Sequence, residues 1–127
     1  MNILPDSIKR FMPLHQQRIV ASSDEFKEVI ERLDREINQI PNRNEKNIVY
    51  AHFFYAGCDW FIKEWDREEN LLFGYAILNQ DLEMSEYGYI ELSDLVEDGR
   101  VELDFYWEPC SMEKALYDKY PSYFPKP

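Results

Sequence analysis

Histidine, cysteine and glycine are all scarce in this chain of 127 residues. Two histidines leave little for acid–base catalysis near neutral pH, and two cysteines, Cys58 and Cys110, supply too few thiolates for a structural zinc site. The four glycines, at positions 57, 74, 88 and 99, stand too far apart for a loop that cradles phosphate. No apolar run approaches the roughly 20 residues of a membrane span. These absences argue against the commonest catalytic and cofactor sites.

The start of the chain, MNILPDSIKR, is too short and too polar for a secretory signal. We therefore expect a cytoplasmic protein with two reduced thiols, although a disulfide between Cys58 and Cys110 is compatible with the sequence. A length of 127 residues suits a single domain whose core needs no metal or disulfide for stability.

Basic residues are scarce in one part of the chain. Residues 1–55 carry eight acidic and eight basic side chains, whereas residues 56–118 carry seventeen carboxylates and four basic residues. This second segment, with a net charge of −13, dominates the total of −11. Its field repels nucleic acid and anionic membranes and favours basic partners or cations. We therefore expect no direct binding of nucleic acid and no membrane association.

Apolar residues between positions 22 and 40 recur every three or four residues, which predicts an amphipathic helix over 22–40. Ser22 and Glu25 have the spacing of a capping box, and Pro41 ends the pattern. A short helix is expected over 6–12, before Pro13, and another over 111–120. The prolines after position 120 predict an extended tail over 121–127.

From Ile48 the apolar period changes to two, which predicts a sheet region over 48–108. The expected strands cover 48–55, 59–66, 71–78, 87–92 and 101–108. Short connections favour an antiparallel meander of four or five strands, so the predicted class is α+β in a single domain, with the long helix on one face. The expected core contacts join Phe26, Ile30, Leu33 and Ile37 to Leu103, Phe105, Ile77 and Phe73.

The histidines and cysteines do not form an obvious catalytic pair. His52 lies within a predicted strand among apolar neighbours, so we expect a buried, hydrogen-bonded side chain, and we expect His15 to be solvated in a loop. A nucleophilic pair of Cys58 with His52 is disfavoured because the adjacent Asp59 opposes thiolate formation.

Carboxylates crowd two predicted connections, at 66–70 and 81–86, where oxygen ligands suit calcium or magnesium. Neither stretch has the spacing of an EF-hand loop. Carboxylate pairs beside tryptophans also suit a glycosidase, but such pairs arise by chance in so acidic a segment. We therefore predict no catalytic residue, metal or cofactor, and keep a small hydrolase or cation-binding protein as a second alternative.

Alternation along the strand predicted over 101–108 places a row of polar side chains on its outward face. One interpretation is a solvated face whose charges oppose aggregation. The other is a surface that binds a basic or mixed protein partner through aromatic anchors with a charged rim. The candidate contacts are Trp60, Glu64, Asp66, Glu102, Asp104, Tyr106 and Glu108.

Three segments of the sheet region resemble a known family. FFYAGCDWFIKEWD at 53–66, LFGYAILNQDLEMSEYGYIELSDL at 72–95 and VELDFYWEP at 101–109 are similar to the domain-of-unknown-function family numbered 2958. The resemblance covers residues 48–110 and not the helix at 22–40. Because members are small bacterial proteins of plasmids, conjugative elements and phages without an established activity, it implies a cytoplasmic accessory protein of a mobile element.

The leading functional hypothesis is a small acidic interaction module that binds a protein partner, and not an enzyme. The alternative is a DNA mimic that inhibits a restriction or CRISPR nuclease, because carboxylates in rows can occupy a groove evolved for phosphates. The alternation puts few acids on one face, which disfavours the mimic. No feature of the sequence specifies an oligomeric state.

Overall fold

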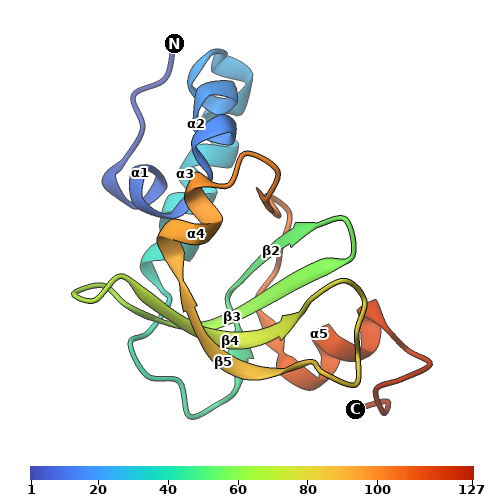
Figure 1. The fold of residues 1–127 in the computed structure, drawn as a ribbon. Helices are drawn as coiled ribbons and strands as arrows, with labels where there is room; N and C mark the ends of the chain where they lie inside the picture. Colours follow the sequence, from blue (N-terminus) through green and yellow to red (C-terminus); the bar gives the residue numbers. More distant parts are fainter.

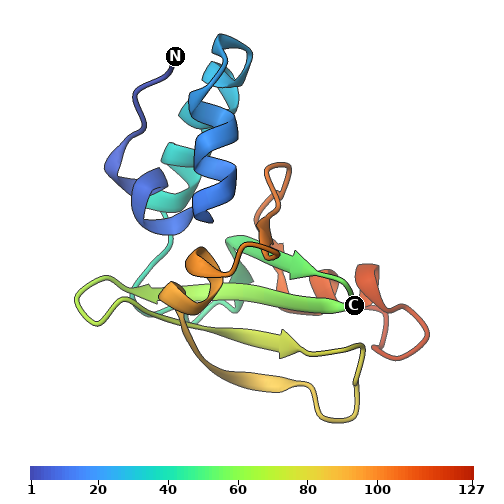
Figure 2. The same cartoon turned by 45° about the horizontal axis from the view of Figure 1, so that its top comes forward.

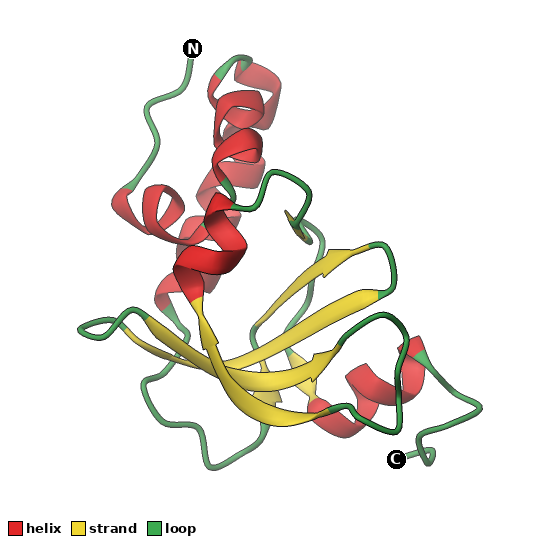
Figure 3. Cartoon of the chain, in the orientation of Figure 1, coloured by secondary structure: helices red, strands yellow, loops and turns green.

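The chain folds into an N-terminal group of helices, a five-stranded antiparallel sheet and a C-terminal helix (Figures 1 and 3). The computed structural model describes all residues from 1 to 127. The elements are α1 (Asp6–Phe11), α2 (Leu14–Ala21), the 3-10 helix η1 (Asp24–Phe26), α3 (Lys27–Asn38), β1 (Ile48–Val49), β2 (Ala51–Tyr55), β3 (Cys58–Asp66), β4 (Leu71–Ile77), β5 (Glu86–Glu91), α4 (Leu92–Glu97), β6 (Glu102–Leu103), β7 (Cys110–Ser111) and α5 (Met112–Lys119).

The strand order in the main sheet is β5-β4-β3-β2-β6, and every neighbouring pair is antiparallel. Strands β2 to β5 follow one another as a meander, which confirms the predicted α+β class and antiparallel sheet. Ala56 and Gly57 join β2 to β3 with φ values of 38° and 88°. Two positive values in a two-residue loop match the turn that suits the twist of a hairpin.

The two faces of the sheet pack against different helices, as Figures 1 and 2 show. Alternation along β2 sends Ala51 and Phe53 into the larger core, which contains residues of α1, α2, α3 and α4. On the opposite face Phe61 packs with Met112 and Leu116 of α5. The N-terminal helices therefore pack on one face of the sheet, and the single helix α5 packs on part of the other face.

The stripe on α3 packs as predicted, because Ile30, Leu33 and Ile37 share the larger core with Leu103. Phe26 and Phe105 lie only partly buried at its margin. The predicted contacts to Ile77 and Phe73 are wrong. Ile77 belongs to the smaller core under α5, and Phe73 faces the same side because Leu72, its neighbour in β4, fills the larger core.

The N-terminal helices begin and end differently from the prediction. The helix expected over 22–40 starts with η1, capped by Ser23, which accepts a hydrogen bond from the Glu25 amide. Ser22 instead donates to the Ile19 carbonyl, so the expected Ser22 capping box is absent. The helix α2 was not predicted at all. Pro13 follows α1 and is also the N-cap residue of α2. Proline is tolerated at the start of a helix, because the amides there have no partner within the helix.

Two of the predicted strands are shorter than expected. The strand over 48–55 is interrupted at Tyr50, where β1 leaves the sheet and pairs with β7. The strand over 101–108 contains only Glu102–Leu103. It ends because the Asp104 carboxylate accepts a hydrogen bond from the Tyr106 amide at 2.9 Å, which closes a turn.

The hairpin of β3 and β4 is tied to the end of α3 by one arginine. The Arg67 guanidinium donates to the carbonyls of Ile40 at 2.9 Å and Ile37 at 3.1 Å, and it stacks over Trp65 at 4.2 Å. Carbonyls at a helix C-terminus lack partners within the helix. Arg67 therefore supplies these partners from a distant part of the chain.

Gly74 of β4 lies at a close approach of two strand backbones. A Cβ atom at this position would lie 2.0 Å from the Phe61 carbonyl oxygen. We expect Gly74→Ala to lower the free energy of unfolding by about 3 kcal/mol, at the upper end of overpacking penalties, because the obstacle is backbone. Urea melts would measure the change.

Gly88 provides the matched control, because it pairs with Gly74 across β4 and β5 and a Cβ there meets no atom within 4 Å. We expect Gly88→Ala to change the free energy of unfolding by less than about 1 kcal/mol. Equal effects of the two substitutions would contradict the close approach at Gly74.

Candidate functional site

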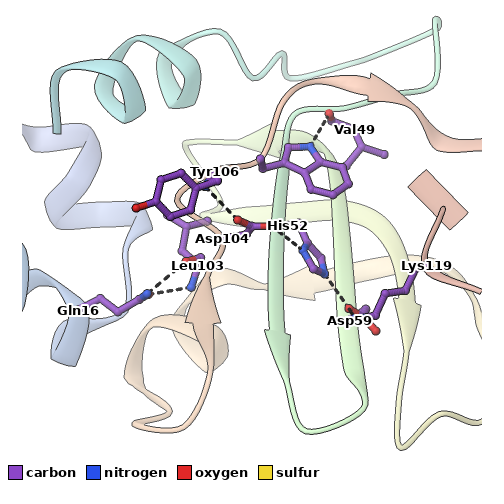
Figure 4. A network of polar contacts seen from close by, with 9 residues as sticks. Gln16, Val49, His52, Asp59, Leu103, Asp104, Tyr106 and Lys119 are labelled. Atoms are coloured by element: carbon purple, nitrogen blue, oxygen red, sulfur yellow. Dashed lines mark hydrogen bonds and ion pairs between the residues drawn. The ribbon is translucent and has the colours of Figure 1, made fainter. Parts of the chain in front are cut away.

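His52 lies on β2 between two carboxylates, as Figure 4 shows. Its Nε2 atom is 2.7 Å from Oδ1 of Asp59, and its Nδ1 atom is 3.4 Å from Oδ2 of Asp104. His52 is only 6% exposed and Asp59 only 1%. The predicted buried, hydrogen-bonded state of His52 is therefore confirmed.

The hairpin and the end of β6 bring the two carboxylates to His52. The register pairs His52 with Phe61 and Phe54 with Asp59, so Asp59 lies on the same face as His52, one diagonal step away. The Asp104 amide donates to the His52 carbonyl at 2.9 Å, directly after β6 ends. The backbone contact thus fixes the distance between the two side chains.

The contacts of both ring nitrogens determine the protonation state of His52. Burial by itself lowers the pKa of His52, but hydrogen bonds to Asp104 and Asp59 and the charges of both carboxylates outweigh it and raise the pKa above 6.5. The His52 hydrogen bond, partly opposed by burial, holds the pKa of Asp104 below 3.8. Two acceptors facing two nitrogens favour the imidazolium, the only form in which both nitrogens donate.

Aromatic rings and α5 enclose the network. The His52 ring stacks on Phe61 with centroids 4.8 Å apart and contacts Trp107 at 5.1 Å. The Tyr120 hydroxyl donates to Asp59 at 3.3 Å, and burial, followed by the charge of Asp59, raises the pKa of Tyr120. The Lys119 ammonium lies 3.9 Å from Asp59.

A cleft of about 510 Å³ opens above this network, between the 104–110 loop and α5. Both nitrogens of His52 face carboxylates, so in this arrangement neither has a free lone pair to accept a proton from a ligand in the cleft. Cys110 also lines the cleft, and burial raises its thiol pKa, which disfavours the nucleophilic thiolate. The geometry therefore supports a structural role that joins β2, β3, β6 and α5.

A second region lies on the same face of the sheet, where α5 does not cover β4 and β5. We call it the aromatic strip and define it as Phe73, Tyr87 and Tyr89. Phe73 contacts Tyr89 with ring centroids 5.1 Å apart and stacks with Tyr87 at 6.1 Å. Tyr87 is 42% exposed and Tyr89 is 74% exposed. This strip is therefore a continuous aromatic surface that no helix covers.

Acidic residues border the aromatic strip. A cleft of about 540 Å³ beside it is lined by Phe73 and Tyr89 together with Glu45, Glu64 and Asp66. Arg43 also lines this cleft. The Lys63 ammonium lies 5.8 Å from the centroid of the Tyr87 ring. Carboxylates thus outnumber the basic groups at this border.

The structure divides the predicted binding residues among separate places. Glu64 and Asp66 line the cleft beside the strip, whereas Trp60 points to the other face and packs partly buried against the larger core. The structure does not contain the predicted outward row of Glu102, Asp104, Tyr106 and Glu108, because the strand that would align these side chains ends at Leu103.

The members of that expected row have different surroundings. Asp104 binds His52, and Glu102 is exposed on the edge strand β6. Tyr106, 79% exposed, and Glu108 lie in the loop that follows. The row is therefore not a continuous surface.

The sequence interpretation did not name the aromatic strip, Asp59 as a partner of His52, or the contact of Asp104 with His52. A signal existed for the strip, because Tyr87 and Tyr89 alternate on a predicted strand and Phe73 alternates with Tyr75 on another. His15 was expected in a loop but lies in α2, where its Nε2 contacts the Val101 carbonyl at 2.8 Å.

The two acidic connections have local structural uses. In the first, Asp66 Oδ1 accepts hydrogen bonds from the amides of Glu68 and Glu69, and in the second Asp81 accepts one from Met84. No three His, Cys, Asp or Glu side chains cluster in a way that suits a metal ion. Cys58 and Cys110 are free thiols. None of the helices combines the length and the apolar character that crossing a membrane requires.

Comparison of the chain with protein-family models, with curated proteins and with solved structures finds no significant match. The resemblance to family 2958 stays a prediction. The functional argument therefore depends on the geometry of the two regions described above.

The His52 network makes stability depend on pH. Below about pH 6.5 His52 is protonated in both the folded and the unfolded chain, so its contribution is complete. As the pH rises through the raised pKa of the folded state, the proton leaves and the contribution is lost. We expect the free energy of unfolding, measured by urea melts from pH 6 to 9, to fall for this reason.

Variants would assign the decline. His52→Gln removes the charge between Asp59 and Asp104, so we expect a loss of about 3 kcal/mol at pH 6 that becomes smaller at higher pH. His15→Gln should retain the decline, because His52 is still present. If the difference in unfolding free energy between wild type and His52→Gln did not change with pH, the pKa of His52 would be the same in the folded and the unfolded chain, which would contradict the raised pKa.

Proposed function

We propose that the protein is a small interaction module that binds a basic segment of a protein partner over the aromatic strip. The observation that carries this proposal is the uncovered sheet face, where Tyr89 is 74% exposed and in ring contact with Phe73. Tyrosine is enriched at protein interfaces because it supplies a large and rigid contact area with a polar end. This surface is the best anchor in the molecule for a partner.

The surrounding charge favours a basic partner. Glu45, Glu64 and Asp66 line the cleft beside the strip, and Glu91, at the end of β5, lies on the same face as Tyr87 and Tyr89. Lysine or arginine side chains of a partner can pair with these carboxylates and also lie over the tyrosine rings. The net charge of −13 over residues 56–118 would also accelerate the encounter at low salt.

The DNA-mimic alternative receives less support from the geometry. A mimic needs acids aligned on one face, since duplex DNA carries one charge per about 1.7 Å of axis. Here Glu64 and Asp66 lie beside the aromatic strip, Asp104 is engaged with His52, and Glu108 lies in a separate loop. Family 2958 membership would make the partner a protein met by a mobile element.

A matched pair of tyrosine variants tests the binding surface. After capture of a partner from a host lysate with the wild-type chain, the affinity of that purified partner would be measured by calorimetry. We expect Tyr89→Ala to weaken binding at least tenfold, as removal of an aromatic anchor does. Raising the salt from 50 to 300 mM should weaken binding further, because the carboxylate rim is screened.

Tyr106→Ala is the control, because Tyr106 is equally exposed, at 79%, but lies in the loop after β6. We expect this variant to bind like the wild type. A partner that loses affinity with Tyr106→Ala and not with Tyr89→Ala would place the binding surface on the loop and overturn the proposal.

A further inference from the structure

The two edges of the main sheet are treated differently. At the β6 edge the Gln16 side chain of α2 binds the backbone of Leu103 twice, as Figure 4 shows. The Leu103 amide donates to Gln16 Oε1 at 2.7 Å, and Gln16 Nε2 donates to the Leu103 carbonyl at 3.1 Å. Gln16 is only 7% exposed. Its amide group therefore occupies the place of a further strand and closes this edge.

The β5 edge is open. Strand β5 pairs only with β4, and none of the turn, loop and side-chain hydrogen bonds reaches the backbone of residues 86–91. The strand contains no proline and no bulge, and it forms one edge of the sheet beside β4, as Figure 1 shows. Natural proteins usually protect such an edge, because its free amides and carbonyls pair readily with another chain.

We infer that β5 receives an extended, basic segment of the partner as a sixth strand of the sheet. This inference rests on the proposed function and specifies how the partner binds. Six residues in β5 are enough for a continuous ladder, and strand addition gives affinity through the backbone and specificity through alternate side chains. Alternate side chains of the added strand would lie beside Tyr87 and Tyr89.

The charges at the ends of β5 select the occupant. Glu86 and Glu91 are both exposed. A second copy of this chain would bring a net charge of −11 against an equal net charge, and two such fields repel each other. Lysines or arginines on a partner strand would instead pair with both glutamates. The geometry therefore favours a basic strand over self-association.

Gly88 leaves space in the centre of the strand. A Cβ atom here would meet nothing within 4 Å, so side chains of an added strand on either side of this position encounter no obstacle from it. Ile90, which packs partly buried against the larger core, holds the end of β5 in place. The open edge is therefore part of an ordered strand.

A pair of synthetic peptides tests the inference. The probe is a fluorescent octapeptide of alternating lysine and valine, and its control has the same sequence with every backbone nitrogen methylated, so that neither edge of the peptide can donate. Anisotropy in 50 mM salt should show at least tenfold weaker binding of the methylated peptide, because it cannot complete a ladder. Hydrogen exchange should show at least tenfold slower exchange of alternate amides in β5 when the unmodified peptide is bound.

Charge variants provide a second measurement. Glu86→Lys should weaken binding of the unmodified peptide severalfold, whereas Glu97→Lys, which makes the same charge change at an exposed position of α4, should weaken it much less. Equal losses would mean that only the overall field of the protein attracts the peptide, which overturns strand addition.

The remaining outcomes also decide between the proposals. Equal binding of both peptides without protection of β5, or no binding of either, overturns strand addition. The proposed function is tested separately by the partner's loss of affinity with Tyr89→Ala. Protection of β5 in the absence of peptide, together with a dimer in analytical ultracentrifugation, would identify a second copy as the occupant and overturn the basic partner.

Discussion

The contact of the His52 imidazolium with Asp59 and Asp104 is the interaction that joins the β2–β3 hairpin, the end of β6 and the end of α5. A buried carboxylate, Asp59, and a partly exposed one, Asp104, would repel each other on neighbouring parts of the sheet, and Asp59 also loses its hydration. A cation between them resolves both problems. The same three side chains connect the first hairpin, the end of β6 and, through Tyr120, the end of α5. The charge of His52 therefore adds to the backbone contact of Asp104 and to the Trp107–Val49 hydrogen bond in holding the 104–110 loop.

Coverage of the sheet is unequal, and this inequality produces the surface proposed for binding. The face toward α1 and α3 is filled by a large core that includes Trp65 and Phe53. On the other face, the eight residues of α5 cover Phe61 and Ile77 but reach no further along β4 and β5. Exposed aromatic area of this kind gains free energy on burial. The short helix thus leaves part of the sheet available to a partner.

Local patterns in the sequence were sufficient for the α+β class, for the meander and for the burial of His52. They were sufficient because hairpins and amphipathic helices form between residues close in the chain. Predictions from local patterns were wrong where contacts between residues distant in the chain determine the structure. Alternation over 101–108 is that of a strand, but Asp104 turns toward His52, which is fifty-two positions away in the chain. Similarly, Leu71–Ile77 is apolar on both faces, so only its pairing with β3 and β5 could show that Phe73 joins the exposed face.

The sealed edge at Gln16 limits how far the sheet can grow. A chain with two open edges can add copies of itself or of other strands at both sides and so extend without limit, which is the geometry of a fibril. Here the buried side-chain amide of Gln16 blocks the β6 edge. Copies of this chain can therefore pair only through β5, and a pair formed in that way has no open edge left for a third copy. The molecule is therefore a terminus for strand pairing, and it can present an exposed edge without being able to polymerise through it.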